Sequence, residues 1–486
     1  MFRFLIYLFF FFSFCGYSQI SIHHERAWIL DSVNTHFTLQ SSVFPASDTL
    51  LSSDTSICRF SIFPDVIFSN RFDELKMQLG SGFTFSGNFK DKLSYESDFR
   101  LGYSNQSPVI YSSFLQSKAF YLKEINKVNY FTSDYIYLDL RAKLIYSPHR
   151  LVKFSAGIDR ISIGEGDRSL LSGNQGVSSP FLGIHTNFWK LKYDFVQQVW
   201  REQFGNHFEP KGNATHYLSY KHDSHLTIGL FETVIYQMKD TLYNRGFEVE
   251  YLNPFLFFRS QEYNLGSQDN VLLGLNVSYK LGNKMYYGQL LIDDFLLAAV
   301  RANNGWWSNK YGFQFGLKGW KNIDSNYQIF YRSEINYIRP FTYSQTTKSS
   351  VYSNQGLPIA HPLGSNFFEL YNEIAITRNK WNLQVWLQLY VKGNDFFNLP
   401  NSPSYGGDIY RSYKYYVSEF KNKVGQGETV HSAHLGFQLS REIGKQQFRT
   451  FIEPRIFATN VEGYGYVNYF LSIGIQRNIG YDRRNY

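Results

Sequence analysis

Long segments of alternating apolar and polar residues limit this chain to β-structure. Between residues 76 and 90, apolar side chains occupy odd positions and most even positions are polar, the apolar ones being Met77, Leu79, Phe83, Phe85 and Phe89. After a tight turn at Lys90-Asp91, residues 93–103 repeat the pattern. Because successive side chains of a strand point to opposite faces, this pattern predicts an antiparallel hairpin with one apolar and one polar face.

The same pattern recurs in roughly 16 to 18 segments between residues 75 and 478, most of them about 10–15 residues long. A membrane-crossing strand needs about 9–11 residues, whereas strands of soluble proteins average about 5–6. Short turns alternate with longer links, which include residues 204–213, 341–356 and 394–412. We therefore expect an all-β fold, a transmembrane antiparallel β-barrel of about 16–18 strands with short periplasmic turns and longer extracellular loops.

Composition supports this class. Aromatic residues make up 19% of the 486 residues, charged residues only 18%, and no uncharged apolar run long enough for a membrane helix follows residue 18. The net charge is 48 − 40 = +8. It fits either a loosely basic surface or attraction to anionic partners such as phosphorylated lipid or acidic polysaccharide. No basic cluster or basic helix indicates nucleic acid.

The first 18 residues predict a secretory signal peptide, with Arg3 before an apolar stretch and small Gly16 and Ser18 before the cleavage point. A lipoprotein with Cys15 as the lipidated residue is the alternative. After the signal peptide we expect an N-terminal segment, residues 19–74, that forms a first strand, a cap or a partial plug. Residues 75–486 would form the barrel. The predicted location is integral in the outer membrane.

Several segments carry a family resemblance. They are Gly164–Leu171 with Pro180–Leu182, Leu252–Pro254 with Arg259 and Glu262, Leu265–Asn270 with Leu273–Leu275, Tyr287–Gln289 with Asp293–Phe295, Asn304–Trp307 with Asn309 and Lys310, Arg339–Tyr343, and Ala360–Gly364 with Asn366. In this order they resemble the Wzi-like capsule-assembly outer-membrane barrels, and within them the gliding-motility RemB-like branch. The resemblance implies a barrel that binds capsular polysaccharide or exopolysaccharide at the cell surface and supports gliding motility or adhesion. Residues 19–74 show no strong amphipathic helices, which argues against a Wzi-type periplasmic helical bundle.

A polar stretch without alternation, residues 253–270, is the main candidate glycan site. Its polar side chains would hydrogen-bond sugar hydroxyls, and neighbouring rings would stack on sugar faces. The candidates are Asn253, Arg259, Glu262, Asp269 and Asn270. An alternative is an Arg–Glu lock that holds a lumen loop.

Three further residues are candidate glycan contacts. Arg168, in the loop 164–169, would face an anionic glycan. Trp306, beside Trp307, is either a sugar-stacking platform or an interfacial anchor, since Trp favours the headgroup level. His361 belongs to the resemblance segment Ala360–Gly364.

Other functions have weaker support in the sequence. His431 and His434 should face opposite sides of one strand and cannot share a metal, and neither G-x-S-x-G nor H-E-x-x-H occurs. We expect no enzyme, no cofactor and no metal, although barrel enzymes with Ser-His pairs on the outer wall leave an exception open. The expected partners are surface polysaccharide and outer-membrane lipid, with motility or secretion machinery as a further option.

Two other functions remain open alongside the polysaccharide-binding barrel: an outer-membrane channel or porin, and a structural partner of a surface secretion or adhesion machine. The polar even-numbered faces fit a channel. Aromatic residues at lumen-facing positions, Phe330, Trp386 and Tyr390, indicate a partly filled lumen instead.

Overall fold

A computed structural model describes residues 39–41, 57–71, 74–89, 92–104, 127–131, 134–173, 177–204, 207–238, 251, 269–324, 326–396, 402–443 and 448–477. The strands are β1 (Leu39–Ser41), β2 (Ile57–Arg71), β3 (Glu74–Phe89), β4 (Leu93–Ser104), β5 (Lys127–Phe131), β6 (Asp134–His149), β7 (Val152–Asp159), β8 (Ile161–Ile163), β9 (Ser179–Phe188), β10 (Leu191–Phe204), β11 (His207–Lys221), β12 (Leu226–Gln237), β13 (Asn270–Leu281), β14 (Lys284–Asp294), β15 (Lys310–Asp324), β16 (Tyr327–Ile338), β17 (Ser353–Asn354), β18 (Leu357–Pro358), β19 (Phe367–Arg378), β20 (Trp381–Asn394), β21 (Glu428–Ile443), β22 (Phe448–Val461) and β23 (Tyr464–Arg477). The helical turns are α5 (Leu297–Arg301), η3 (Lys348–Ser350) and η4 (Tyr413–Tyr415).

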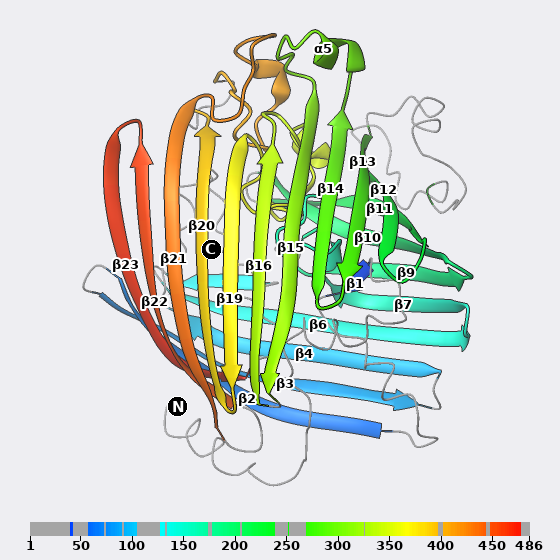
Figure 1. Ribbon diagram of the computed structural model, residues 1–486, viewed down its shortest axis with the longest axis vertical. Coiled ribbons are helices and arrows are strands. Elements are labelled where there is room, and N and C mark those ends of the chain that lie inside the picture. Colours follow the sequence, from blue (N-terminus) through cyan, green and yellow to red (C-terminus); the bar gives the residue numbers. More distant parts are fainter. Residues whose placement is uncertain are drawn as a thin grey trace.

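The strands form one closed antiparallel barrel (Figure 1). Among the described residues, eighteen strands follow one another round it, and β2 closes the ring against β23 through pairs such as Phe68 with Ile473. The short strand β5 pairs with one end of β6. The predicted transmembrane barrel is therefore confirmed in class and in strand number.

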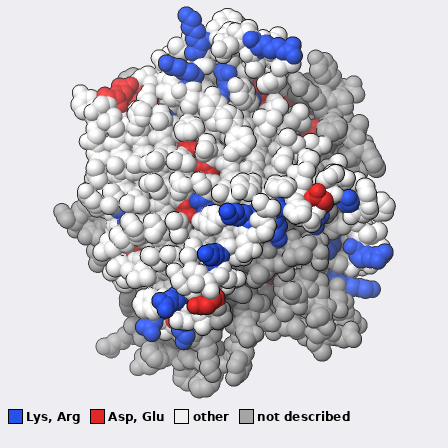
Figure 2. Space-filling model, viewed as in Figure 1, with Lys and Arg blue, Asp and Glu red and all other residues white. Residues whose placement is uncertain are grey.

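The alternation of apolar and polar residues along each strand places apolar side chains on the outer face of the barrel wall and polar side chains on the inner face. Across β19 and β20, outward Leu370 lies opposite Leu389, whereas inward Glu369 lies opposite Tyr390. Leu389 is 36% exposed and Glu369 is fully buried. Figure 2 shows broad areas of the outer wall over β20–β23 with few charged side chains. An apolar outer wall and a polar interior are the arrangement of membrane barrels.

The two ends of the barrel differ. Tight turns join β6 to β7, β9 to β10, β13 to β14 and β19 to β20 at one end, which we call the short-turn end. At the opposite, long-loop end, α5 lies between β14 and β15, and long connections precede β19 and β21 (Figure 1). Helix α5 is short and carries the basic Arg301 in its last turn. No helix among the described residues is long and apolar enough to cross a membrane.

One predicted link is wrong. Phe204 is the last residue of β10 and residues 207–213 belong to β11, with Phe204 paired to His207 and Arg201 to Pro210. Pro210 and Gly212 interrupt the alternation in sequence. The ladder continues through them because β10 pairs with both residues, and β12 pairs with β11 from Lys211 onward, so the Pro210 nitrogen is not needed as a donor to β12.

Two connections of the long-loop end turn into the lumen. We call residues 160–173 the first inner segment and residues 339–366 the second inner segment. Their apolar side chains join inward residues of β10–β14, β16 and β19, and Ile409 of the β20–β21 connection, in one buried cluster: Ile163, Leu170, Leu171, Trp200, Tyr217, Phe231, Ile235, Leu272, Leu291, Ile338, Tyr343, Val351, Tyr352, Ile359, Ala360, Phe367 and Ile409. Both segments therefore fill part of the lumen. Trp386 and Tyr390 are also buried on the inner wall.

Near the N-terminus, the described residues are β1, which pairs with β8 through Leu39 and Ile163, and β2 of the barrel. The predicted signal peptide, residues 1–18, lies outside the described residues.

Candidate functional site

Two predicted site residues, Arg168 and His361, meet on one carboxylate. The Arg168 Nη2 atom lies 2.8 Å from Glu369 Oε1, and Arg168 Nε donates to Oε2 at 2.8 Å. His361 Nε2 lies 2.7 Å from the same Oε2. All three residues are almost completely buried. Their contacts fasten both inner segments to β19, and their role in glycan binding stays a prediction.

The first inner segment is also fixed by polar side chains of the inner wall. Gln289 Oε1 accepts hydrogen bonds from Ser169 Oγ and the Leu170 amide, at 3.1 and 2.8 Å. Gln314 Nε2 donates to the Arg168 carbonyl at 2.9 Å. Beyond its short strand β8, the segment therefore satisfies backbone groups of residues 168–170 against side chains of β14 and β15.

Burial perturbs two titratable groups of the inner segments. It raises the pKa of Glu165 to about 7, although Lys318, whose Nζ lies 3.5 Å from Glu165 Oε2, opposes the shift. It lowers the pKa of His361 to about 4, against the attraction of Glu369. A neutral His361 can donate from Nε2 to the carboxylate while its Nδ1 accepts from the Leu363 amide at 3.1 Å.

Asp269 and Asn270 come together at the start of β13. Asp269 accepts a hydrogen bond from the Tyr251 hydroxyl, and Asn270 Nδ2 donates to the Ser350 carbonyl at 2.9 Å. Gln345 Nε2 donates to Asn270 Oδ1 at 2.8 Å. Asn270 thus holds the second inner segment. The other three candidates of this stretch, Asn253, Arg259 and Glu262, lie outside the described residues.

Trp306 lies apart from these residues, at the long-loop end. It belongs to a group of aromatic rings that we call the mouth platform: Trp306, Trp307, Tyr413 and Tyr416. The rings of Trp307 and Tyr416 stack with centroids 5.0 Å apart at an interplanar angle of 11°. The Trp307–Tyr413 and Trp306–Trp307 centroid distances are 5.0 and 6.4 Å.

Charged and backbone groups support the mouth platform. Lys310 Nζ lies 4.4 Å from the Tyr413 ring centroid, a cation–π contact. Arg339 Nη2 donates to the Trp306 carbonyl at 3.3 Å, and the Trp307 amide donates to the Glu419 carbonyl at 2.9 Å. Contacts from β15, through Lys310, and from the second inner segment, through Arg339, therefore hold the mouth platform in place.

The mouth platform remains accessible. Tyr416 is 37% exposed, and Trp306, Trp307 and Tyr413 are half-buried. Lys and Arg side chains cluster along the same end of the molecule (Figure 2); the exposed ones on these loops are Arg301, Lys414, Lys421 and Lys423. Flat aromatic faces stack on the apolar faces of sugar rings, and nearby cations attract acidic groups.

The sequence analysis found only part of this platform. Trp306 and Trp307 stood out as a pair, but Tyr413, Tyr416, Lys310 and Arg339 were not predicted as site residues. Residues 413–416 are Tyr-Lys-Tyr-Tyr within a loop. This concentration of aromatic rings is the sequence feature from which the rest of the mouth platform could have been predicted.

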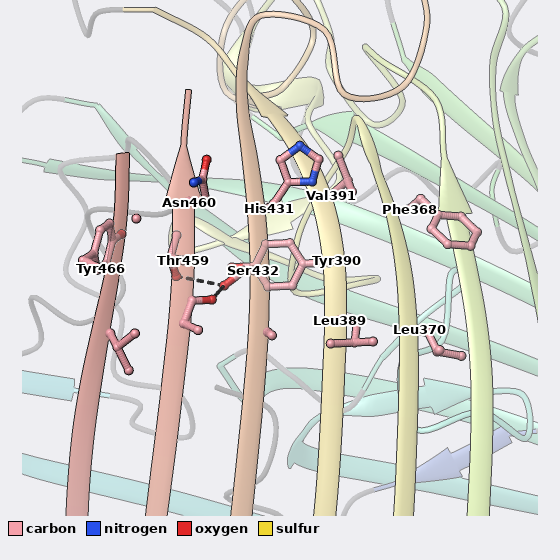
Figure 3. A pocket seen from close by; sticks show the side chains of 14 residues that line it. Phe368, Leu370, Leu389, Tyr390, Val391, His431, Ser432, Thr459, Asn460 and Tyr466 are labelled. Carbon is pink, nitrogen blue, oxygen red and sulfur yellow. Dashed lines mark hydrogen bonds between the residues drawn. The ribbon is translucent and has the colours of Figure 1, made fainter. Parts of the chain in front are cut away.

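A hollow on the outer wall is a second feature near the long-loop end. It has a volume of about 570 Å³. Its floor is a cross-strand row, Leu370, Leu389, Ala433, Ala458 and Val467. The small side chains of Ala433 and Ala458 create the hollow, and His431 and Asn460 lie beside it (Figure 3). The lining is mainly apolar and suits apolar contact rather than sugar binding.

The predicted opposite directions of His431 and His434 are confirmed, since His431 is exposed and His434 buried. In the described part of the chain, no group of three or more His, Cys, Asp or Glu side chains is arranged to hold a metal ion.

Comparison with known proteins gives a fold relationship. No protein-family model matches the sequence, and no curated protein matches it. Among solved structures, the chain is similar to Wzi of Escherichia coli, an outer membrane protein involved in group 1 capsule assembly and a carbohydrate-binding β-barrel. The TM-score is 0.57 at 13% identity, covering 93% of this chain and 96% of Wzi. OprD of Pseudomonas aeruginosa matches with a TM-score of 0.46 at 9% identity, covering 91% of this chain and 98% of OprD. The chain thus has the fold of an outer-membrane β-barrel similar to Wzi.

Proposed function

We propose that this protein is an integral outer-membrane barrel that binds capsular polysaccharide or exopolysaccharide at the cell surface through the mouth platform. The observation that carries the proposal is the accessible stack of Trp307 on Tyr416 beside Trp306, at the long-loop end and with exposed cations around it. Long loops face the outside in barrels of this kind, so the platform would meet polysaccharide there.

Two further observations support binding at the mouth. The inner segments occupy part of the lumen, which favours a binding protein over a wide diffusion channel. The fold is similar to that of Wzi, a carbohydrate-binding barrel. The exposed Arg301, Lys414, Lys421 and Lys423 favour an acidic polysaccharide.

The proposal extends to export and cellular role. Residues 1–18 would direct secretion as a cleaved signal peptide, and Trp306 would contact sugar rather than anchor the barrel. Membership of the RemB-like branch would link the bound polysaccharide to gliding motility or adhesion, with motility or secretion machinery as a partner. The proposal is binding of polysaccharide at the mouth platform and includes no chemical reaction there.

The test is a pull-down of the refolded full-length barrel with polysaccharide from its own host. We expect the wild type to bind and Trp307→Ala or Tyr416→Ala to weaken binding about tenfold or more, since stacking aromatics contribute about 1–3 kcal/mol each when buried against a ligand. Trp381→Ala is the matched control, because Trp381 is an exposed tryptophan at the short-turn end, 47% exposed.

Three results would contradict the proposal. One is the absence of binding together with steady open conductance in planar bilayers, which would indicate a channel. Another is binding that Trp307→Ala and Tyr416→Ala leave unchanged while the fold stays intact. The third is co-purification with a secretion or adhesion machine, without glycan binding, which would instead identify a structural partner.

A further inference from the structure

Three side chains on the inner wall form a continuous hydrogen-bonded chain. Ser155 Oγ lies 2.8 Å from His185 Nε2, and His185 Nδ1 lies 2.7 Å from Asp194 Oδ1. The three residues come from β7, β9 and β10, which are neighbours in the barrel. Serine, histidine and aspartate joined in this order, through opposite ring nitrogens, are the arrangement of a serine hydrolase.

Strand register explains why these residues meet. Ser155 is the fourth residue of β7, Asp194 the fourth of β10, and His185 the fourth from the end of β9, so all three lie near the short-turn end. Asp194 is the direct cross-strand partner of His185. Ser155 faces Gly183, and a Cβ atom there would lie 2.4 Å from Ser155 Oγ and 2.9 Å from His185 Nε2. The missing side chain of Gly183 therefore leaves the space in which serine and histidine meet.

Aspartate fixes the histidine tautomer. The ionised Asp194 carboxylate only accepts hydrogen bonds, so Nδ1 of His185 carries the proton and donates it. Nε2 is then free to accept the Ser155 hydroxyl proton, which is the state a general base requires. Lys192 Nζ lies 3.3 Å from Asp194 Oδ2 and balances the buried carboxylate.

We propose that Ser155, His185 and Asp194 hydrolyse short-chain carboxylic esters that enter the lumen, an activity beyond the proposed glycan binding. Ser155 Oγ attacks the ester carbonyl carbon and gives its proton to His185 Nε2. The C–O bond to the alcohol breaks, and the alcohol leaves with that proton. Water then attacks the acyl–Oγ ester and passes a proton to Nε2. The acyl–Oγ bond breaks, the carboxylic acid leaves, and Ser155 recovers its proton.

The surroundings set the substrate class. The His185 side chain is 23% exposed, so the site is open to the lumen. Ser155 is 7% exposed, and Ile161, Phe181 and Val196 pack in one buried cluster on the same part of the barrel. This crowding favours a short acyl group. Lys153, the cross-strand neighbour of His185, adds positive charge that favours the tetrahedral oxyanion.

A second serine–histidine contact provides an internal comparison. Ser432 Oγ lies 2.9 Å from His434 Nε2, but His434 Nδ1 faces Gln388 Oε1 at 3.0 Å, a neutral amide. Both residues are buried, and Ser432 Oγ also lies 2.9 Å from Thr459 Oγ1. Because the Nδ1 atom contacts a neutral amide where the triad has a carboxylate, this pair is not expected to act as a nucleophile.

The experiment uses the full-length protein folded in detergent micelles. A fluorophosphonate probe should label the wild type at Ser155, located by peptide mass spectrometry, and p-nitrophenyl acetate should be hydrolysed faster than p-nitrophenyl laurate. Ser155→Ala should abolish labelling. His185→Gln should lower the acetate rate about 100-fold. Ser432→Ala is the matched control and should retain both signals.

Heat-modifiable migration in gels verifies the barrel fold of each variant, and glycan binding on the same preparations tests the proposed function separately. An unlabelled, inactive wild-type barrel with intact fold would overturn the triad. Labelling that persists in Ser155→Ala, or is lost in Ser432→Ala, would overturn it equally.

Discussion

The Arg168 guanidinium and the Glu369 carboxylate form a two-bond ion pair inside the barrel, with both N···O distances at 2.8 Å. The two residues are 201 positions apart and both are almost completely buried. This pair joins the first inner segment to β19. A structural Arg–Glu lock was the alternative for residues 253–270, and the described residues contain such a lock at a different place.

The first prediction removes one partner of this pair. Arg168→Met leaves the Glu369 charge buried without its guanidinium, which should reduce the free energy of unfolding by about 3–5 kcal/mol. The double variant Arg168→Met/Glu369→Gln removes both charges and should recover most of that loss. Urea unfolding in micelles measures both.

The control for this prediction is Arg378→Met, since Arg378 is exposed at the short-turn end. It should change stability by less than about 0.5 kcal/mol. A double variant as unstable as the single one would show that packing, rather than an uncompensated charge, holds the segment.

The second prediction concerns pH. The pKa of His361 is lowered to about 4 by burial, whereas an unfolded histidine titrates near 6.5. The unfolded state therefore binds a proton first, and stability is lost as pH falls from about 6.5 to 4. At pH 5 the loss from this residue amounts to about 2 kcal/mol.

His361→Gln tests this, because an amide can still donate to Glu369 but cannot be charged. As pH drops from 7 to 5, the free energy of unfolding of the wild type should fall by more than that of the variant. Two stability curves that stay parallel over this range would rule out His361 as the titrating group.

The sequence predicts the barrel because the alternation of apolar and polar residues indicates which side chains face the lumen and which face outward. Lumen positions such as Trp386 and Tyr390 follow from it. The contacts of Arg168 cannot be predicted in this way, because they depend on how a connection folds back through a closed ring. Likewise, Ser155, His185 and Asp194 carry no local motif, and only the register of three strands brings them together.

The third prediction concerns Asn366, which supports the loop of the mouth platform. Its φ is +59°, a left-handed conformation that asparagine tolerates better than most residues. Its side chain donates to the carbonyls of Gly393 and Gln426 at 3.0 and 2.9 Å and accepts from the Gly425 amide at 2.9 Å. Asn366→Ala loses these bonds and should cost about 2–4 kcal/mol locally.

Trypsin measures this local effect, since Lys421 and Lys423 are exposed in the same loop. Cleavage there should accelerate, and glycan binding should fall, while the barrel stays folded. Asn303→Ala is the control, because Asn303 is exposed and also has a positive φ of 48°. Equal cleavage rates in the two variants would mean that the Asn366 side chain does not hold the loop.

The last prediction concerns the lumen, where two tyrosines of the second inner segment hold the first. The Tyr343 hydroxyl donates to the Leu170 carbonyl at 2.7 Å, and the Tyr352 hydroxyl donates to the Leu171 carbonyl at 2.8 Å. Replacing both with phenylalanine leaves two buried carbonyls without these donors while nearly preserving volume. The inner segments should then separate more often, so single-channel conductance in planar bilayers should be low in the wild type and higher in the double variant. High, equal conductance in both proteins, with heat-modifiable migration intact, would mean that ions pass beside these segments and that the protein acts as a channel.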